Sequence, residues 1–351
     1  MKRQAFKNIA VAFIAVLVGL ASCQKDNKEL AVEMEVVEFA INPTEVKTVN
    51  IYSDTDWSIE IKQAGGWLSV TPASGRNDGT LTLTAQVNDD FAERYATITV
   101  AGEDVKDKTI AVIQQGDKTK DVILLEKMQQ HIDESWYIFE YDEQHRLTKR
   151  NHYDSNDSLR SVMTLTYDDD GDLESVLWVN VQYLFFYRPG FTKEGNKISF
   201  WDYGMSRYEI ELNTEELPEK LTYYWRPKMA HGWSNTTYNY KWVNRNLSQA
   251  DYTAIGVTSH DEEFEKSGTN IYTYDDKKSP FYHCATPRWF WLWYYYVTVS
   301  DCSLNNLVSV NSDYVNYEYT YNEDGFLAKE KRNGGTITYT YKRRPGSGNI
   351  E

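Results

Sequence analysis

Aromatic and polar side chains that suit ligand binding gather on both sides of one predicted turn in the second half of the chain. An indole or phenol ring presents a flat apolar face to a ligand ring, and neighbouring Arg and Asn side chains supply hydrogen bonds. This combination is typical of sites that stack sugar rings. The candidate ligand-binding residues are Tyr224, Trp225, Arg226, Trp233, Asn235, Tyr240 and Trp242. The alternative is that the turn is solvated and that its rings cover neighbouring strands.

A denser aromatic run follows later in the chain, at residues 288–297. We expect a strand over residues 288–300, in which Trp289, Trp291 and Trp293 would share one face. Phe290 and other apolar residues would occupy the opposite face. Two apolar faces are typical of a central strand covered on both sides, so we expect core residues here. The alternative is a concave sheet face that offers its rings to a glycan.

Catalytic and metal-binding patterns are weak. The run Asp168-Asp169-Asp170-Gly171-Asp172 offers the carboxylates that calcium prefers, but an EF-hand needs a loop of about twelve residues between two helices. Alternating segments flank this run, so we interpret it as a charged turn. The six His residues are scattered, and no GxSxG, CxxC or HExxH spacing occurs. We therefore predict no catalytic residue, no metal site, no cofactor and no enzyme activity.

The composition describes an acidic chain that is long enough to fold. It has 351 residues, a hydrophobic content of 41% and a net charge of −15. The length suggests about two domains, and the apolar content suffices for substantial cores. Nucleic-acid binding needs clustered Lys and Arg, and the sequence contains no such stripe. We therefore exclude nucleic acid as a partner.

The N-terminus has the layout of a secretory signal. Lys2, Arg3 and Lys7 precede the apolar residues 9–20, a run shorter than the roughly twenty residues of a spanning helix. The closing Leu20-Ala21-Ser22-Cys23 resembles the bacterial lipobox. That resemblance implies cleavage before Cys23 and acylation of this cysteine. We expect residues 1–22 to be a lipoprotein signal peptide and residues 23–30 to be a tether.

The residues after Cys23 add a location to this prediction. Gln24-Lys25-Asp26-Asn27-Lys28-Glu29 resembles the short Lys/Asp/Glu-containing export signal of Bacteroidetes lipoproteins. It implies a protein anchored to the outer membrane through Cys23 and facing the extracellular side. The alternative is a solvated tether, because charged residues keep the chain in water.

The first domain is predicted to be a β-sandwich. Seven short alternating segments separated by turn residues indicate strands at 36–41, 46–53, 57–62, 67–71, 79–87, 95–100 and 109–115. Trp57 and Trp67 each lie within such a strand, and a large ring there fills a core. The alternative role for these two rings is sugar stacking.

Specific residues in this region resemble the BACON domain. They are Asp56-Trp57, the run from Gly66-Trp67 to Ser74-Gly75, Asn88, the run from Arg94-Tyr95 to Val100, and Ile113-Gln114-Gln115-Gly116. The resemblance implies an immunoglobulin-like sandwich over residues 31–116 of the kind found on Bacteroidetes surface proteins. Its role is either carbohydrate binding or that of a rigid spacer.

The second domain is predicted to be antiparallel β structure. Residues 117–122 form a polar linker, residues 123–345 an aromatic-rich domain, and residues 346–351 a disordered tail. One phrase recurs at 139–148, 165–174 and 319–327: an apolar residue, Tyr, Asp or Asn, polar residues, then a return to Leu. Asp or Asn starts a turn between two strands, so each copy predicts a hairpin. The phrase resembles the YD repeat. Residues 271–281, followed by residues 303–308, resemble uncharacterised Bacteroidetes lipoproteins, from which no activity can be inferred.

The remaining cysteines are predicted to be unpaired. Cys284 and Cys302 flank the predicted strand 288–300. A strand of that length separates its ends by roughly 40 Å at about 3.3 Å per residue, far beyond the reach of a disulfide.

Together these patterns predict an all-β, acylated envelope lipoprotein that binds a glycan or glycoprotein without catalysis, as an accessory to nutrient capture or adhesion. The alternative function is a structural or protein-interaction module with an outer-membrane protein partner. A glycoside hydrolase is the third hypothesis, because a pair of carboxylates at hydrolytic spacing is a property of the fold and not of the sequence.

Overall fold

The computed structural model describes most of the chain beyond the N-terminal segment. The described residues are 28–62, 66–202, 206–226, 232–293, 303–311, 313–314, 317–332 and 335–346. The predicted signal peptide, Cys23, Cys302 and most of the predicted tail lie outside these residues, so those predictions stay untested. Among the described residues, no helix combines the length and apolarity needed to cross a membrane.

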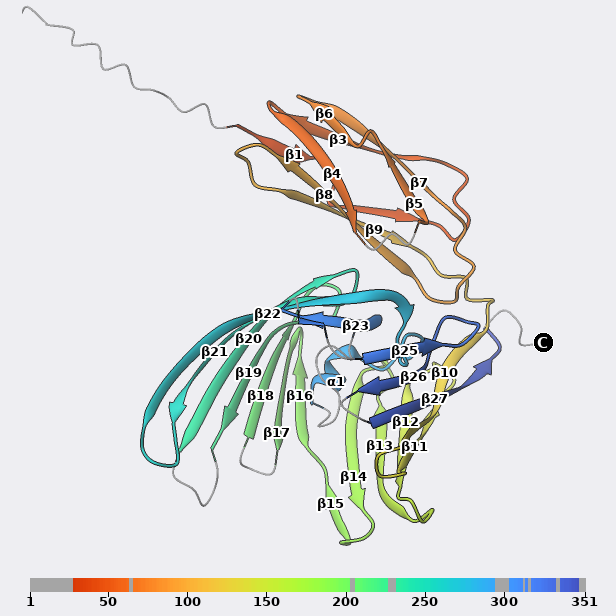
Figure 1. The fold of residues 1–351 in the computed structure, drawn as a ribbon, viewed down its shortest axis with the longest axis vertical. Helices are drawn as coiled ribbons and strands as arrows, with labels where there is room; N and C mark the ends of the chain where they lie inside the picture. The colour runs from red at the N-terminus through yellow and green to blue at the C-terminus, as the bar shows by residue number, and fades with distance from the viewer. Residues whose placement is uncertain are drawn as a thin grey trace, which may run out of the picture.

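Strands β1–β9 form two facing sheets, which we call the N-terminal sandwich (Figure 1). One sheet has the order β1 (Leu30–Val32), β3 (Lys47–Ser53), β7 (Gly79–Ala85) and β5 (Leu68–Thr71). The other has the order β2 (Val36–Phe39), β9 (Lys108–Gln114), β8 (Arg94–Gly102), β4 (Asp56–Lys62) and β6 (Ser74–Arg76). All seven predicted strands are present, and the short β1 and β6 are additions.

The core of the N-terminal sandwich follows the alternation of its strands. Leu81 and Leu83 of β7 are fully buried between Thr residues that point away from the core. Trp57 is 3% exposed, and its Nε1 donates to the carbonyl of Asn77 at 2.8 Å. Gly75 lies so close to this ring that an added Cβ would meet it at 2.2 Å. Trp67 is also buried, so the prediction that both tryptophans fill the core is confirmed.

The rest of the described chain forms two nine-stranded sheets, which we call the C-terminal sheets. The first has the order β15 (Phe185–Tyr187), β14 (Leu173–Asn180), β13 (Leu159–Tyr167), β12 (Leu147–Tyr153), β11 (Trp136–Tyr141), β10 (Val122–Gln130), β27 (Gly335–Arg344), β26 (Leu327–Arg332) and β25 (Tyr317–Tyr321). The second has the order β16 (Gly190–Glu194), β17 (Lys197–Asp202), β18 (Ser206–Leu212), β19 (Pro218–Trp225), β20 (Trp233–Val243), β21 (Asn246–Val257), β22 (Glu263–Lys278), β23 (Asn305–Val310) and β24 (Asp313–Tyr314). The all-β fold class is therefore confirmed.

The hairpins within these sheets repeat one turn geometry. Within the described residues, six turns have an Asp, Asn or Thr whose side-chain oxygen accepts the backbone N–H four residues later: Arg146 to Asp142, Ser158 to Asp154, Asp172 to Asp168, Leu217 to Asn213, Glu262 to Thr258 and Phe326 to Asn322. The three predicted hairpins are among them, and the Asp168–Asp172 run is one of these turns. In every copy the residue before the N–H donor has a positive φ, from 56° at Glu216 to 89° at Gly171.

A short helix corrects one prediction. Residues Arg288–Trp293 form α1, not the first half of a strand. Every residue after Arg288 in this stretch is apolar, so the sequence has neither a period of two nor one of 3.6 that would separate strand from helix. Pro287 favours the helix, because proline suits its first turn.

The expectation that this aromatic run lies in the core is confirmed for the residues whose side chains are described. Trp289, Phe290 and Trp291 are at most 5% exposed and belong to the cluster that both C-terminal sheets share. Figure 1 shows α1 between the two sheets. Because residues 288–293 are helical, the argument that a continuous strand keeps Cys284 and Cys302 too far apart for a disulfide no longer holds. Cys284 is a buried free cysteine, and Cys302 lies outside the described residues.

Candidate functional site

A hollow at one end of strands β17–β20 gathers part of the predicted site. Its volume is about 630 Å³, which is in the size range of small-molecule pockets. We call it the aromatic hollow. It is lined by Trp201, Ser206, Arg207, Tyr224, Trp225, Arg226, Trp233 and Ser234.

The register of the strands explains why these residues meet. Trp201 at the end of β17 lies directly opposite Arg207 of β18, and Arg207 lies opposite Tyr224 of β19. Directly opposed residues share a face of the sheet, so these three side chains form one row. Trp225 is the next residue along β19 and lies opposite Ser234, on the other face. The hollow therefore wraps around the ends of the strands, where the two faces of the sheet meet.

The rings of the hollow are exposed to a degree that is unusual for their size. Trp201 and Trp233 are each 42% exposed, and Tyr224 and Trp225 are each 38% exposed. Single exposed aromatic residues are ordinary on protein surfaces, but several in one concavity mark an interaction site. The hollow thus offers flat apolar faces to a ligand.

Two guanidinium groups accompany these rings. Arg207 lies 5.9 Å from the centroid of the Trp201 ring, and its Nη2 is 2.5 Å from the Glu209 carboxylate. Arg226 directly follows Trp225 and is exposed. The hollow can therefore combine stacking with hydrogen-bond donation to oxygen atoms.

The structure divides the seven predicted ligand residues into two groups. Four of them line the hollow: Tyr224, Trp225, Arg226 and Trp233. Asn235 lies opposite Tyr224 but outside the lining. Tyr240 is 5% exposed in the shared core. Trp242 is partly buried, and its Nε1 donates to the Pro218 carbonyl at 2.5 Å.

Sequence reasoning did not find the contribution of β17 and β18. Trp201, Ser206 and Arg207 lie some twenty residues before the predicted turn and reach the hollow only through strand pairing. One local signal was available in the sequence: Ile198 and Phe200 are apolar and two residues apart, so alternation places Trp201 on the opposite face of the strand.

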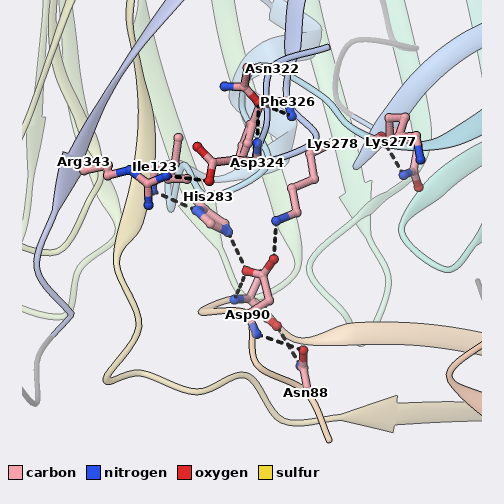
Figure 2. A network of polar contacts seen from close by, with 12 residues as sticks. Asn88, Asp90, Ile123, Lys277, Lys278, His283, Asn322, Asp324, Phe326 and Arg343 are labelled. Atoms are coloured by element: carbon pink, nitrogen blue, oxygen red, sulfur yellow. Dashed lines mark hydrogen bonds and ion pairs between the residues drawn. The ribbon is translucent and has the colours of Figure 1, made fainter. Parts of the chain in front are cut away.

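Apart from the aromatic hollow, a cluster of polar side chains lies where the N-terminal sandwich contacts the C-terminal sheets (Figure 2). We call it the polar junction. Asp90 of the sandwich accepts a hydrogen bond from His283 Nε2 at 2.8 Å and pairs with Lys278. His283 Nδ1 in turn accepts the backbone N–H of Ile123 at 2.9 Å. Nδ1 therefore carries no proton, and Nε2 is the donor to Asp90.

The ionisation of the polar junction follows from these contacts. Burial acts to raise the pKa of Asp90, but the hydrogen bonds and charges of His283 and Lys278 outweigh it and hold the pKa well below its usual range. Burial lowers the pKa of His283, although the Asp90 carboxylate opposes that shift. The charged Asp90 and the neutral His283 are thus hydrogen-bonded to each other across the contact between the N-terminal sandwich and the C-terminal sheets. We therefore assign the junction a structural role.

A second contact supports the same docking. The Asn244 side chain at the β20–β21 turn accepts from the Thr97 hydroxyl and donates to the Lys62 carbonyl, both at 3.0 Å. Arg245 lies 5.6 Å from the centroid of the Tyr95 ring.

Comparisons with known proteins identify the first region. Residues 55–115 match the family described as "BACON: Putative binding domain, N-terminal". These residues form a BACON domain. The resemblance stated from the sequence is therefore confirmed for this part of the chain.

Solved structures show weaker likenesses. A Bacteroides ovatus GH5 xyloglucanase in complex with a XXXG heptasaccharide is 26% identical over 26% of this chain, with a TM-score of 0.24. This chain covers 20% of that enzyme. A porin-like protein from Bacteroides uniformis is 12% identical, with a TM-score of 0.30. The match spans 62% of this chain and 98% of the porin-like protein. No curated protein matches the chain.

Proposed function

We propose that the aromatic hollow binds a glycan, free or carried by a glycoprotein, without chemical turnover, and that the protein thereby assists nutrient capture or adhesion. One observation carries the proposal: four half-exposed aromatic rings line a single concavity of about 630 Å³. The C–H face of a pyranose ring is apolar and packs on an indole, whereas its edge carries hydroxyls that need hydrogen-bond partners. The lining offers both, because Ser206 and Ser234 accompany the rings.

Binding without catalysis fits the chemistry of the lining. Glycoside hydrolysis uses two carboxyl groups on either side of the scissile bond, and none of the described lining residues is Asp, Glu or His. The description of the BACON family as a binding domain agrees with a non-catalytic role.

We also propose that Cys23 carries acyl chains that hold the protein on the outer membrane, facing outward. The lipobox-like sequence before Cys23 supports this location. A single acyl chain binds a membrane only marginally, so durable anchoring needs two or more chains. The N-terminal sandwich would then act as a spacer between the lipid and the hollow. Loss of acyl labelling in a Cys23→Ala variant would support the anchor, and equal labelling of this variant would refute it.

A different surface favours the second hypothesis, a protein-interaction module. The turn between β14 and β15 exposes Tyr183 by 73% and Leu184 by 88%, and Phe186 of β15 beside it is 72% exposed. Such a protruding apolar tip is typical of a contact with another protein. Co-purification of an outer-membrane protein, lost in a Tyr183→Ala/Phe186→Ala variant, together with no glycan affinity, would favour this function.

A glycan array probed with the full-length protein tests the glycan proposal. We expect binding to a defined set of glycans that the Trp225→Ala/Trp233→Ala variant loses. The Tyr183→Ala/Phe186→Ala variant serves as a matched control, because it removes two exposed rings outside the hollow. The proposal fails if the folded protein binds no glycan, or if both variants bind as the parent does.

A further inference from the structure

The charge of the aromatic hollow runs against the charge of the whole chain. The protein has a net charge of −15, with 52 Asp and Glu against 37 Lys and Arg. The hollow reverses this balance, because two of its eight described lining residues are Arg and none is acidic. We propose that its ligand is an anionic glycan, one that carries a carboxylate or a sulfate. This inference rests on the proposed function and specifies its ligand class.

Arg207 is held where a charged sugar substituent would meet it. It lies directly opposite Trp201 on one side and Tyr224 on the other, so its guanidinium group belongs to the same row as two stacking rings. Glu209 neutralises part of its charge through a contact of 2.5 Å at Nη2. A guanidinium group has five N–H donors, so this single contact leaves donors that can reach a ligand.

Arg226 is the less compensated cation. It is exposed, directly follows Trp225, and forms no hydrogen bond or ion pair with any residue in the described part of the chain. Exposed Arg residues are common and are usually solvated. The distinguishing feature is that this one lines a concavity in which no described lining residue carries a carboxylate, beside three tryptophans.

The two arginines suit an anion better than a neutral sugar. Guanidinium groups bind carboxylate and sulfate oxygens through charge-assisted, often bidentate hydrogen bonds. An acidic chain repels anions over its surface as a whole, so a local cationic site is needed to admit one. A neutral glycan would need only the rings and the hydroxyls.

Titration calorimetry with paired probes tests the inference. Oligogalacturonate is compared with its methyl ester, and a sulfated galactan oligosaccharide with its desulfated form, each against the full-length protein. We expect at least one acidic probe to bind tenfold or more tightly than its neutral counterpart, and to lose that advantage in an Arg207→Gln/Arg226→Gln variant. The Arg188→Gln variant is the control, since Arg188 is exposed outside the hollow.

Each outcome has a defined meaning. A preference for oligogalacturonate alone, for the sulfated probe alone or for both supports the inference and identifies the acidic group. Equal affinity for each acidic probe and its neutral partner, with no effect of the Arg variants, overturns the inference and leaves glycan binding standing. Absence of binding by all four probes overturns this inference, and the glycan array then decides the proposed function separately.

Discussion

Tryptophans in the N-terminal sandwich and in the aromatic hollow all lie in or next to strands, but they have opposite surroundings. Trp57 and Trp67 are 3% and 7% exposed, whereas Trp225 and Trp233 are 38% and 42% exposed. In the sandwich a second sheet and small residues such as Gly75 cover the ring. In the hollow the rings lie at strand ends. The comparison shows that the position of a ring relative to an opposing layer decides between core and surface, not the residue type.

The arginines beside these rings differ in the same way. Arg94 lies 4.7 Å from the centroid of the Trp67 ring, and it donates to the Gln114 side chain and to the carbonyls of Gln86 and Val87. Its donors are used within the sandwich, so the pair has a structural role. Arg226 forms no such bond with any residue in the described part of the chain, as its proposed role in ligand binding requires.

The largest effect should come from removing a covered ring. We expect Trp57→Ala to lower the free energy of unfolding by about 3–5 kcal/mol, because it leaves a cavity in the sandwich core. Trp233→Ala should change it by less than about 0.5 kcal/mol, since its ring is exposed. Denaturant unfolding followed by circular dichroism measures both. Equal losses in the two variants would mean that the hollow is part of a core.

A smaller effect is expected at the polar junction. Asp90→Asn should lower the free energy of unfolding by about 1.5–3 kcal/mol, because it removes a charged acceptor from His283 and Lys278. Asp89→Asn is the control, since Asp89 is exposed next to it. Thermal unfolding compares the two variants, and an Asp90→Asn variant as stable as the parent would show that the junction does not hold the two parts together.

The smallest effect concerns the pH dependence of this junction. His283 has a pKa below its ordinary value of 6.5, so the unfolded chain binds more protons in acid and stability falls as the pH drops below 6.5. The pKa of Asp90 is also lowered, so Asp90 contributes a further loss of stability only when the pH falls below 3.8, the ordinary pKa of an Asp side chain. We expect His283→Gln to reduce the slope of unfolding free energy between about pH 5 and 6.5 by at most about 1.4 kcal/mol per pH unit.

The groups that face His283 define the control for this prediction. Asp90, Lys278 and Lys118 act on its charge, and the Ile123 amide occupies Nδ1. The exposed His260 lies outside the polar junction, and His260→Gln is the matched control variant. An unchanged slope in His283→Gln would exclude this residue as the source of the acid sensitivity.

Local sequence patterns predicted much of the fold. Alternation located seven strands of the sandwich, and Tyr followed by Asp or Asn located three hairpins. The turns at Asn213 and Thr258 were missed because Leu212 and Val257 stand where the phrase has Tyr. The turn at Asp154 follows Tyr153 as the phrase requires, and it was overlooked. A uniformly apolar run hid helix α1, because no period could be read from it.

The candidate site was only half predictable for a different reason. Tyr224, Trp225, Arg226 and Trp233 lie close together in sequence, on the two sides of the predicted turn, so proximity along the chain revealed them. Trp201 and Arg207 join them through the register of β17, β18 and β19. Register depends on how whole strands pair, and the local pattern of one segment does not contain it.

Tryptophan footprinting tests most directly the proposal that a glycan binds in the aromatic hollow. The full-length protein is oxidised with and without a glycan that binds on the array, and the modified tryptophans are identified by mass spectrometry. We expect Trp201, Trp225 and Trp233 to react in the free protein and to be protected by the glycan, while the buried Trp57 and Trp67 stay unreactive in both samples. A bound glycan that leaves the three exposed tryptophans fully reactive would contradict the proposal that the hollow is its binding site.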